Sequence, residues 1–310
     1  MKNTVKLIYF RGGFKCDGHS LKMLGEMQHM IWQTTRFTID LTRPKIMGIV
    51  NVTPDSFSDG GRFDTLNAAL RHCEKLLKDG ADILDIGGES SRPGANPLAL
   101  SQELARVLPL VAEAVKLNVP VSVDTYKPQV MQAVLDAGAD IINDIYALQI
   151  ENAAEVVAAH PNCGVCLMHM HATPETMALN KMQGDVVPQV LAFWKRAVDE
   201  LLGKNVAPAR IVLDPGIGFG KTVGQNFELL RRQSELQAGG FPLLVGWSRK
   251  SSLAAAVSTS LATLATLEAR DRLVPSVTAA ILAVQRGASI VRVHDVRETV
   301  QALRVLNAIK

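Results

Sequence analysis

The chain has 310 residues, of which 47% are hydrophobic, and a formal net charge of +3. This length allows one large domain or two ordinary ones, and the composition is typical of a globular protein with an ample core. The near-neutral charge, without a dense run of Lys or Arg, argues against a nucleic-acid-binding surface. No apolar run reaches the length of a membrane span, so we expect no membrane partner.

The cysteine content bears on the cellular compartment. Cysteines at positions 16, 73, 163 and 166 are too few for a disulfide framework in a chain of this length. We therefore expect reduced thiols and a cytoplasmic protein. The pair Cys163-x-x-Cys166 has metal-like spacing, but no second pair follows and the pair overlaps an apolar strand. We interpret both as buried thiols.

Residues 1–36 differ from the rest of the chain. They mix Lys, Arg, Gly, His and scattered apolar residues without a clear period, and they lack the continuous apolar core of a secretory signal. We expect a poorly ordered N-terminal extension here, followed by one domain over residues 37–310.

From Ile46 onward, short apolar runs of strand type alternate with longer segments that carry apolar residues at helical spacing. The predicted strands cover residues 46–51, 83–86, 121–124, 141–143, 165–168, 211–214, 243–246 and 290–293. The predicted helices include residues 66–79, 102–117, 129–137 and 187–202. Eight strands, each followed by room for a helix, are typical of a (β/α)8 TIM barrel, an α/β fold.

A doubly wound sheet is the main alternative to the barrel. Its dinucleotide fingerprint is absent, because Gly216, Gly218 and Gly220 give G-x-G-x-G. Gly220-Lys221-Thr222 is similar to the end of a P-loop, but Pro215 occupies the place of the required first glycine. We therefore reject both nucleotide-binding interpretations.

Polar residues stand at the carboxyl ends of nearly all the predicted strands. They are Asn51, Asp85, Asp124, Asn143, His169, Asp214, Arg292 and His294. Any one of them could be a turn or cap residue, but turns alone do not explain so many. Because these strand ends share one rim in a barrel, the sequence predicts that the polar side chains converge on one pocket.

The loop after the first predicted strand is unusually rich in functional groups. Residues 51–61 read N-V-T-P-D-S-F-S-D-G-G and include two carboxylates and three hydroxyls, more than a connecting loop needs. This stretch resembles the first signature of dihydropteroate synthase, the folate-pathway enzyme family that sulfonamides inhibit.

Further motifs resemble the same family from about residue 37 to the C-terminus. Residues 85–94, D-I-G-G-E-S-S-R-P-G, are similar to its second loop, with Ser91 in place of the usual Thr. Residues 214–221, D-P-G-I-G-F-G-K, match a later motif. Trp247 departs from the Met common at its position, and we interpret it as a packing residue.

The resemblance implies that Asp124, Asn143 and Asp214 bind a pterin. Their chemistry fits, because a carboxylate accepts from ring N–H groups, whereas an Asn amide donates and accepts. At the eighth strand, alternation puts Arg292 and His294 on one side, beside a helix-starting Asp295 that we interpret as a cap. This arrangement predicts an anion site suited to pyrophosphate.

The remaining site residues follow from the resemblance. Phe219 would lie near an aminobenzoate ring, Ser248 would bind its carboxylate, and Lys250 would lie between the two substrates. Further substrate contacts are expected from Ser91, Arg92, Pro93, Met168 and Gly246. His169-x-His171 could ligate a metal, but a role in the pterin shelf or in hydrogen bonding is the better interpretation.

The resemblance also implies a Mg²⁺ ion, with the Asn51 side-chain oxygen as its protein ligand. Asp59 would assist the metal or a developing cation. Asn51, Asp59, Lys250 and Arg292 would thus be the catalytic residues.

We therefore expect a transferase that forms a C–N bond. It would join hydroxymethyl-dihydropterin pyrophosphate to para-aminobenzoate, giving dihydropteroate and pyrophosphate. A homodimer is expected, with residues 251–277 in its interface. The alternatives are a pterin-binding methyltransferase on a similar barrel and a non-catalytic paralogue.

Overall fold

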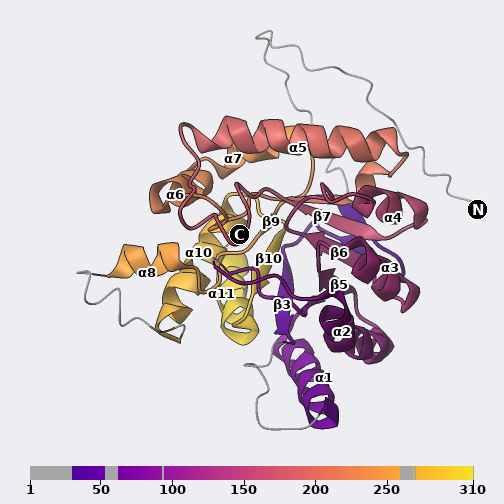
Figure 1. Ribbon diagram of the computed structural model, residues 1–310. Helices are drawn as coiled ribbons and strands as arrows, with labels where there is room; N and C mark the ends of the chain where they lie inside the picture. The colour runs from indigo at the N-terminus through magenta and orange to yellow at the C-terminus, as the bar shows by residue number, and fades with distance from the viewer. Residues whose placement is uncertain (1–29, 53–61, 93, 259–267, 269, 310) are drawn as a thin grey trace, which may run out of the picture.

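Eight parallel strands are hydrogen-bonded in the order β8-β7-β6-β5-β4-β3-β10-β9. A parallel bridge between Leu213 and Leu243 joins the two ends of this order, so the sheet closes into a barrel. Figure 1 shows the computed structural model, in which helices lie around the strands. The structure describes residues 30–52, 62–92, 94–258, 268 and 270–309. The predicted (β/α)8 TIM barrel is confirmed.

The barrel strands differ from the predicted ones by at most one residue at either end. They are β3 (Lys45–Asn51), β4 (Ile83–Gly87), β5 (Val121–Asp124), β6 (Ile141–Asp144), β7 (Gly164–Met168), β8 (Ile211–Asp214), β9 (Leu244–Val245) and β10 (Ile290–Val293). Apolar residues predominate in most of them, as expected of parallel strands that are covered on both faces, whereas β5 and β6 are half polar.

All four predicted helices are present, although residues 115–117 of the second form a 3₁₀ turn and the third ends at Asp136 instead of residue 137. The described α-helices are α1 (Arg62–Asp79), α2 (Leu100–Ala114), α3 (Pro128–Asp136), α4 (Ala153–Ala159), α5 (Val186–Gly203), α6 (Val223–Arg231), α7 (Gln233–Leu236), α8 (Ser251–Val257), α10 (Leu273–Gln285) and α11 (Val296–Ala308). The described 3₁₀ turns are η2 (Val115–Leu117), η3 (Pro208–Arg210), η4 (Gln237–Gly239) and η5 (Arg270–Arg272).

Alternation along the strands builds two separate cores. On β4, Leu84 and Ile86 point outward into the large cluster between strands and helices. Ile83 on the same strand points into the barrel and joins a second cluster with Met47 and Ile290. Asp85 shares the inward face with Ile83, so the interior changes from apolar to charged along a single strand.

A two-stranded hairpin closes the amino end of the barrel. It consists of β1 (Ile31–Gln33) and β2 (Thr38–Asp40), paired antiparallel. Trp32 is completely buried in the interior cluster, and its Nε1 donates to the Arg210 carbonyl oxygen at 2.9 Å. The predicted domain start at residue 37 is therefore too late, because residues 31–36 belong to the folded domain. Residues 1–29 lie outside the described residues.

Arg36 fastens this hairpin to the barrel. Its Nη2 pairs with Asp140 Oδ2 at 2.6 Å, and its Nη1 donates to the Val115 carbonyl oxygen at 2.6 Å. Asp140 is fully buried and also accepts from the Val121 amide at 2.9 Å. Loss of Arg36 would leave a buried carboxylate without its counter-ion, a strongly destabilising change.

Cys73, Cys163 and Cys166 are buried free thiols, in agreement with the interpretation of the C-x-x-C pair, whereas Cys16 lies outside the described residues. Within the described part of the chain, no helix combines the length and hydropathy needed to cross a bilayer.

Trp32→Ala should lower the free energy of unfolding by about 3–5 kcal/mol, because it removes a large aromatic side chain from the closed end of the barrel. Urea denaturation measures this loss. Ile31→Ala on the same strand is the matched control, since Ile31 is 36% exposed, and it should cost about 0.5 kcal/mol or less. Equal stability of the Trp32 variant and the parent would contradict the structural role of the hairpin.

Candidate active site

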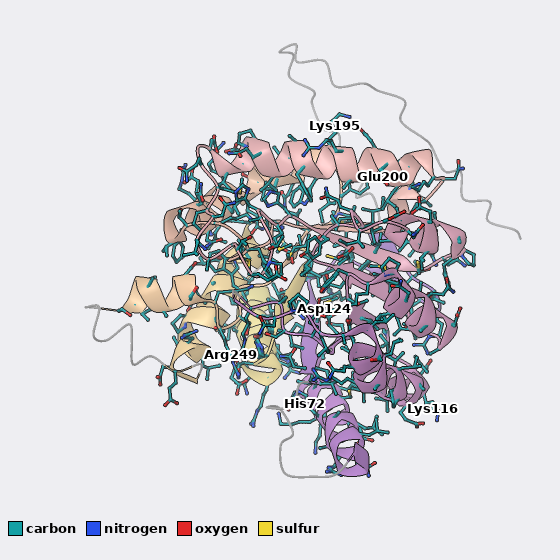
Figure 2. The ribbon with its side chains drawn as sticks, viewed as in Figure 1. His72, Lys116, Asp124, Lys195, Glu200 and Arg249 are labelled. Atoms are coloured by element: carbon teal, nitrogen blue, oxygen red, sulfur yellow. The ribbon has the colours of Figure 1, made fainter. Side chains whose placement is uncertain are left out.

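The predicted polar residues lie at one level of the barrel rim. In the sheet register, Gly87 lies between Asn51 and Asp124. Asp124 in turn pairs with Asn143. Figure 2 shows Asp124 near the centre of the molecule, whereas Lys195 lies on a helix at the periphery. Neighbouring strands therefore present polar side chains to a common space.

Arg292 links two of these strands through ion pairs. Its Nε donates to Asp85 Oδ2 at 2.6 Å, and its Nη2 donates to Asp124 Oδ2 at 2.8 Å. Asn143 Nδ2 donates to the same Asp85 oxygen at 3.3 Å. Asp85 is completely buried. The sequence placed Asp85 at the rim without a role, although a carboxylate inside an apolar strand was a signal for one.

Burial controls the charges in this cluster. It raises the pKa of Asp124 to about 7, although the Arg292 guanidinium opposes the shift. It also raises the pKa of Asp214, whose Oδ1 accepts from the Gly216 amide at 2.7 Å. Burial lowers the pKa of Lys250 to about 8, with Asp214 opposing. A ligand that pairs with Asp124 or Lys250 can therefore change the protonation state of that residue close to neutral pH.

Positive charges gather around His294. Burial lowers the pKa of His294 to about 3, and the nearby cations act in the same direction: Arg249, Arg292, Arg92 and Lys250. The imidazole is therefore neutral and acts through hydrogen bonds. No ion pair of Arg92 with a carboxylate occurs among the described residues. Such a cluster of cations suits an anionic ligand.

Ser248 is hydrogen-bonded to His294. Its Oγ lies 2.9 Å from His294 Nδ1 and accepts from the His294 amide at 3.1 Å. Gly246 precedes it at the end of β9, where an added Cβ would lie 3.9 Å from the Arg292 Cβ. Both predicted residues therefore lie beside the cationic side of the rim.

A buried lysine shapes the loop after β8. Lys221 Nζ donates to the carbonyl oxygens of Gly216, Phe219 and His169 at 2.9, 3.1 and 3.2 Å. A Cβ at Gly216 would come within 1.9 Å of the His169 carbonyl oxygen. Only glycine permits this approach, which explains one glycine of the predicted motif. No pattern in the sequence indicated that Lys221 holds the loop that carries Phe219.

Met168 and Phe219 belong to one apolar cluster, which also contains Ile145 and Met170. Lys250 Nζ lies 4.2 Å from the centroid of the Phe219 ring, within range of a cation–π interaction. The structure thus brings an aromatic ring, thioethers and an amine together at the rim.

The oxygens near Gly87 fit a hard cation. Asn51 Oδ1 and Asp124 Oδ2 each lie 3.8 Å from the position of an added Cβ at Gly87, so both face the space above this glycine. Mg²⁺ takes such oxygens together with waters and phosphate oxygens. The described residues contain no group of three or more His, Cys, Asp or Glu suited to a metal. Asp59 and Pro93, also predicted here, lie outside the described residues.

The role of His169 in the pterin shelf or in hydrogen bonding stays a prediction, and its ring packs edge-to-face on Phe193 of α5, with the centroids 4.9 Å apart. The prediction that Asp295 caps a helix with its side chain is wrong. Asp295 precedes α11 but makes no capping bond with its side chain, which pairs with Arg249 Nη2 at 2.6 Å. Trp247 is a packing residue, as predicted, with its ring centroid 5.4 Å from that of Phe227.

Comparison with known proteins identifies the family. Residues 47–294 match the family described as pterin binding enzyme. The chain is 48% identical over 288 residues to a dihydropteroate synthase of Neisseria meningitidis serogroup B, with 91% of this chain and 99% of the relative covered. The chain belongs to the dihydropteroate synthase family.

Solved structures of other dihydropteroate synthases agree. The Burkholderia cenocepacia enzyme, complexed with 7,8-dihydropteroate, is 45% identical with a TM-score of 0.80 and covers 90% of this chain and 96% of its own. The Xanthomonas albilineans enzyme with 4-aminobenzoic acid is 42% identical with a TM-score of 0.80, covering 88% and 95%. The two alternative functions are not favoured, because relatives that match most of the chain are dihydropteroate synthases.

The raised pKa of Asp124 predicts a pH-dependent stability difference between the parent and Asp124→Asn. A carboxyl whose pKa rises on folding favours the folded state below its unfolded pKa of about 4, and this contribution is lost as pH rises through the folded pKa. The folded pKa is about 7. The parent should therefore lose stability relative to Asp124→Asn as pH rises through this window. Urea denaturation at several pH values measures the difference, and parallel curves would contradict the raised pKa.

Proposed function

We propose that the rim site joins 6-hydroxymethyl-7,8-dihydropterin pyrophosphate to para-aminobenzoate, releasing pyrophosphate and forming 7,8-dihydropteroate. The observation that carries this assignment is the juxtaposition of two chemistries in one site. The buried Asn143 and Asp214 and the partly buried Asp124 supply acceptors and a donor. Arg92, Arg292 and Lys250 supply cations around a neutral His294.

Pterin recognition falls to the residues on the strands. The carboxylates of Asp124 and Asp214 accept from ring and exocyclic N–H groups, and the Asn143 amide donates and accepts. Their fixed positions disfavour rings that would leave these polar groups unpaired. Arg292 Nη2 donates to Asp124 Oδ2, so a pterin that binds this carboxylate competes with the guanidinium for it.

The reaction is a displacement at the pterin methylene carbon. The carbon–oxygen bond breaks with its electron pair going to the pyrophosphate oxygen, and the aminobenzoate nitrogen forms the new C–N bond and loses a proton. Arg292 and Arg92 stabilise the departing anion, since a guanidinium contacts two phosphate oxygens at once. The His294 imidazole contributes a hydrogen bond rather than a charge.

The second substrate occupies the side of the rim near Phe219, Ser248 and Lys250. The Phe219 ring offers a face to the aminobenzoate ring, and the Ser248 hydroxyl offers a donor to its carboxylate. Lys250 lies over Phe219 and contacts both substrates, with an amine whose pKa is lowered by burial. Ser91 lies in the second loop and has a hydroxyl for the same ligand.

Asn51 is the protein ligand that we assign to Mg²⁺, with Asp59 assisting from the first loop. When bound, the ion would neutralise part of the pyrophosphate charge. The other oxygen ligands of Mg²⁺ would come mainly from the substrate and from water, because the protein offers few oxygens at this position.

The proposal also covers the oligomeric state and the cellular compartment. Val257 on α8 and Val274 on α10 are 47% and 73% exposed, and these helices contact each other, which supports a homodimer through this corner. Residues 259–267 of the expected interface lie outside the described residues. The buried free thiols support a cytoplasmic enzyme. Competition by sulfonamides for the aminobenzoate position follows from the proposed chemistry.

A coupled assay of pyrophosphate release tests the function. The purified protein should release pyrophosphate and form dihydropteroate only when both substrates are present. Asp124→Ala should weaken the binding of a plain pterin by a few kcal/mol, or about 100-fold, because it removes a buried charged acceptor.

Asp199→Ala is the matched control, because Asp199 is an exposed carboxylate whose partner is Lys195 on α5. Calorimetry of pterin binding should not distinguish this control from the parent. Undiminished pterin affinity in a folded Asp124 variant would refute the recognition scheme, and absence of pyrophosphate release by the parent would refute the function.

Order of binding provides a second test. If bound pyrophosphate and Mg²⁺ complete the aminobenzoate pocket, equilibrium dialysis should detect tighter aminobenzoate binding when both are present. Asn51→Ala should remove the effect of Mg²⁺ on pyrophosphate binding measured by calorimetry. Equal aminobenzoate affinity with and without the additions would mean that the pocket is preformed.

A further inference from the structure

A polar network beside the proposed reaction centre joins the second loop to the barrel. In this Lys127 network, Lys127 Nζ pairs with Glu89 Oε2 and with Glu103 Oε2, the latter at 2.5 Å. Tyr126 Oη donates to Glu89 Oε1 at 2.8 Å, and Thr125 Oγ1 donates to Glu103 Oε1 at 2.7 Å. All four oxygens of the two carboxylates therefore have a donor.

The network is shielded from water. The side chains of Glu89, Glu103 and Lys127 are 12%, 1% and 15% exposed. Exposed ion pairs contribute little, but a buried cation shared by two acids holds all three groups in place, since release of any one leaves a buried charge unpaired. Burial raises the pKa of Glu103, and the hydrogen bond from Lys127 opposes this shift.

The network joins three segments of the chain around the rim. Glu89 opens the loop that carries Ser91 and Arg92, Glu103 belongs to α2, and Thr125 directly follows Asp124. The network therefore fixes the start of the second loop relative to the pterin carboxylate.

Backbone contacts restrict the same loop on both sides of Glu89. Arg106 Nη1 donates to the Gly88 carbonyl oxygen at 2.9 Å, and a Cβ at Gly88 would come within 2.7 Å of Val107 on α2. Farther along, the Gly94 amide donates to the Pro174 carbonyl oxygen at 2.9 Å. The Arg92 charge contributes to the lowered pKa of both Lys250 and His294 at the rim.

We propose that Glu89 and Lys127 are positioning residues that hold Ser91 and Arg92 at the rim, and thereby set the affinity for aminobenzoate and pyrophosphate. This inference rests on the proposed function. Neither residue is assigned a contact with substrate. A plain pterin is bound by strand residues instead, so its affinity is independent of the second loop.

Glu89→Gln tests the proposal, because it keeps the shape of the side chain and removes the charge that Lys127 binds. The KM for aminobenzoate should rise by about tenfold, the effect of one charge-assisted hydrogen bond. The Kd for a plain pterin should stay within about twofold of the parent, since the strand residues remain in place. Tyr126→Phe, which removes only the hydroxyl donor to Glu89, should raise the same KM by about threefold.

Two further variants separate positioning from general stability. Lys127→Arg retains a cation for both carboxylates and should keep the aminobenzoate KM close to that of the parent. Arg36→Met breaks a buried ion pair at the other end of the barrel and should lower the melting temperature without changing either substrate's KM.

A purely structural role would lower stability in Glu89→Gln while leaving the aminobenzoate KM unchanged, and that result overturns the proposal. A parallel loss of plain pterin affinity also overturns it, because the effect would not be confined to the second loop. Failure of the parent to release pyrophosphate would instead count against the proposed function, so the two failures are distinguishable.

Discussion

The site depends on the requirement that charges buried in the barrel mouth remain paired. Arg292 lies between Asp85 and Asp124, and the register of the parallel strands fixes the distances among them. An unpaired charge at this depth is costly, and the Arg292 guanidinium neutralises both carboxylates. In the proposed reaction, substrate binding is therefore an exchange of partners, in which pterin N–H groups would pair with Asp124 and phosphate oxygens would pair with Arg292. A ligand that has only the N–H groups or only the phosphate oxygens would replace one of these partners and not the other.

The need to pair buried charges also explains why the two ends of the barrel interior differ in composition. At the amino end, Trp32 fills the interior and contacts an apolar layer, while Arg36 neutralises Asp140. At the carboxyl end, the inward side chains are charged and hydrogen-bonded. The apolar end gives the barrel its stability without a ligand, and the polar end can therefore retain groups, such as Lys250, whose pKa burial shifts toward neutrality.

The strands and the rim were predictable because both follow from local patterns. Apolar runs identify buried parallel strands, and the common direction of these strands places Asn51, Asp124 and Asp214 together. The hairpin at residues 31–40 was missed because its strands are too short for a periodic signal. Its stability comes from contacts with residues such as Asp140 and Arg210, more than 100 positions away. The partners of Asp85 and the Lys127 network were missed for a related reason, because these pairs form only in the folded chain.

The arrangement assigns two recognition tasks to elements of different rigidity. In the proposed scheme, the pterin is recognised by strand residues, whose relative positions the sheet register fixes. The second substrate and pyrophosphate would be recognised partly by loop residues, and a loop has no register of its own. The Lys127 network supplies the missing constraint by tying Glu89 to α2 and to the residue after Asp124. Because this constraint is separate from the sheet, a change in the loop can alter binding of the second substrate while the pterin site keeps its geometry.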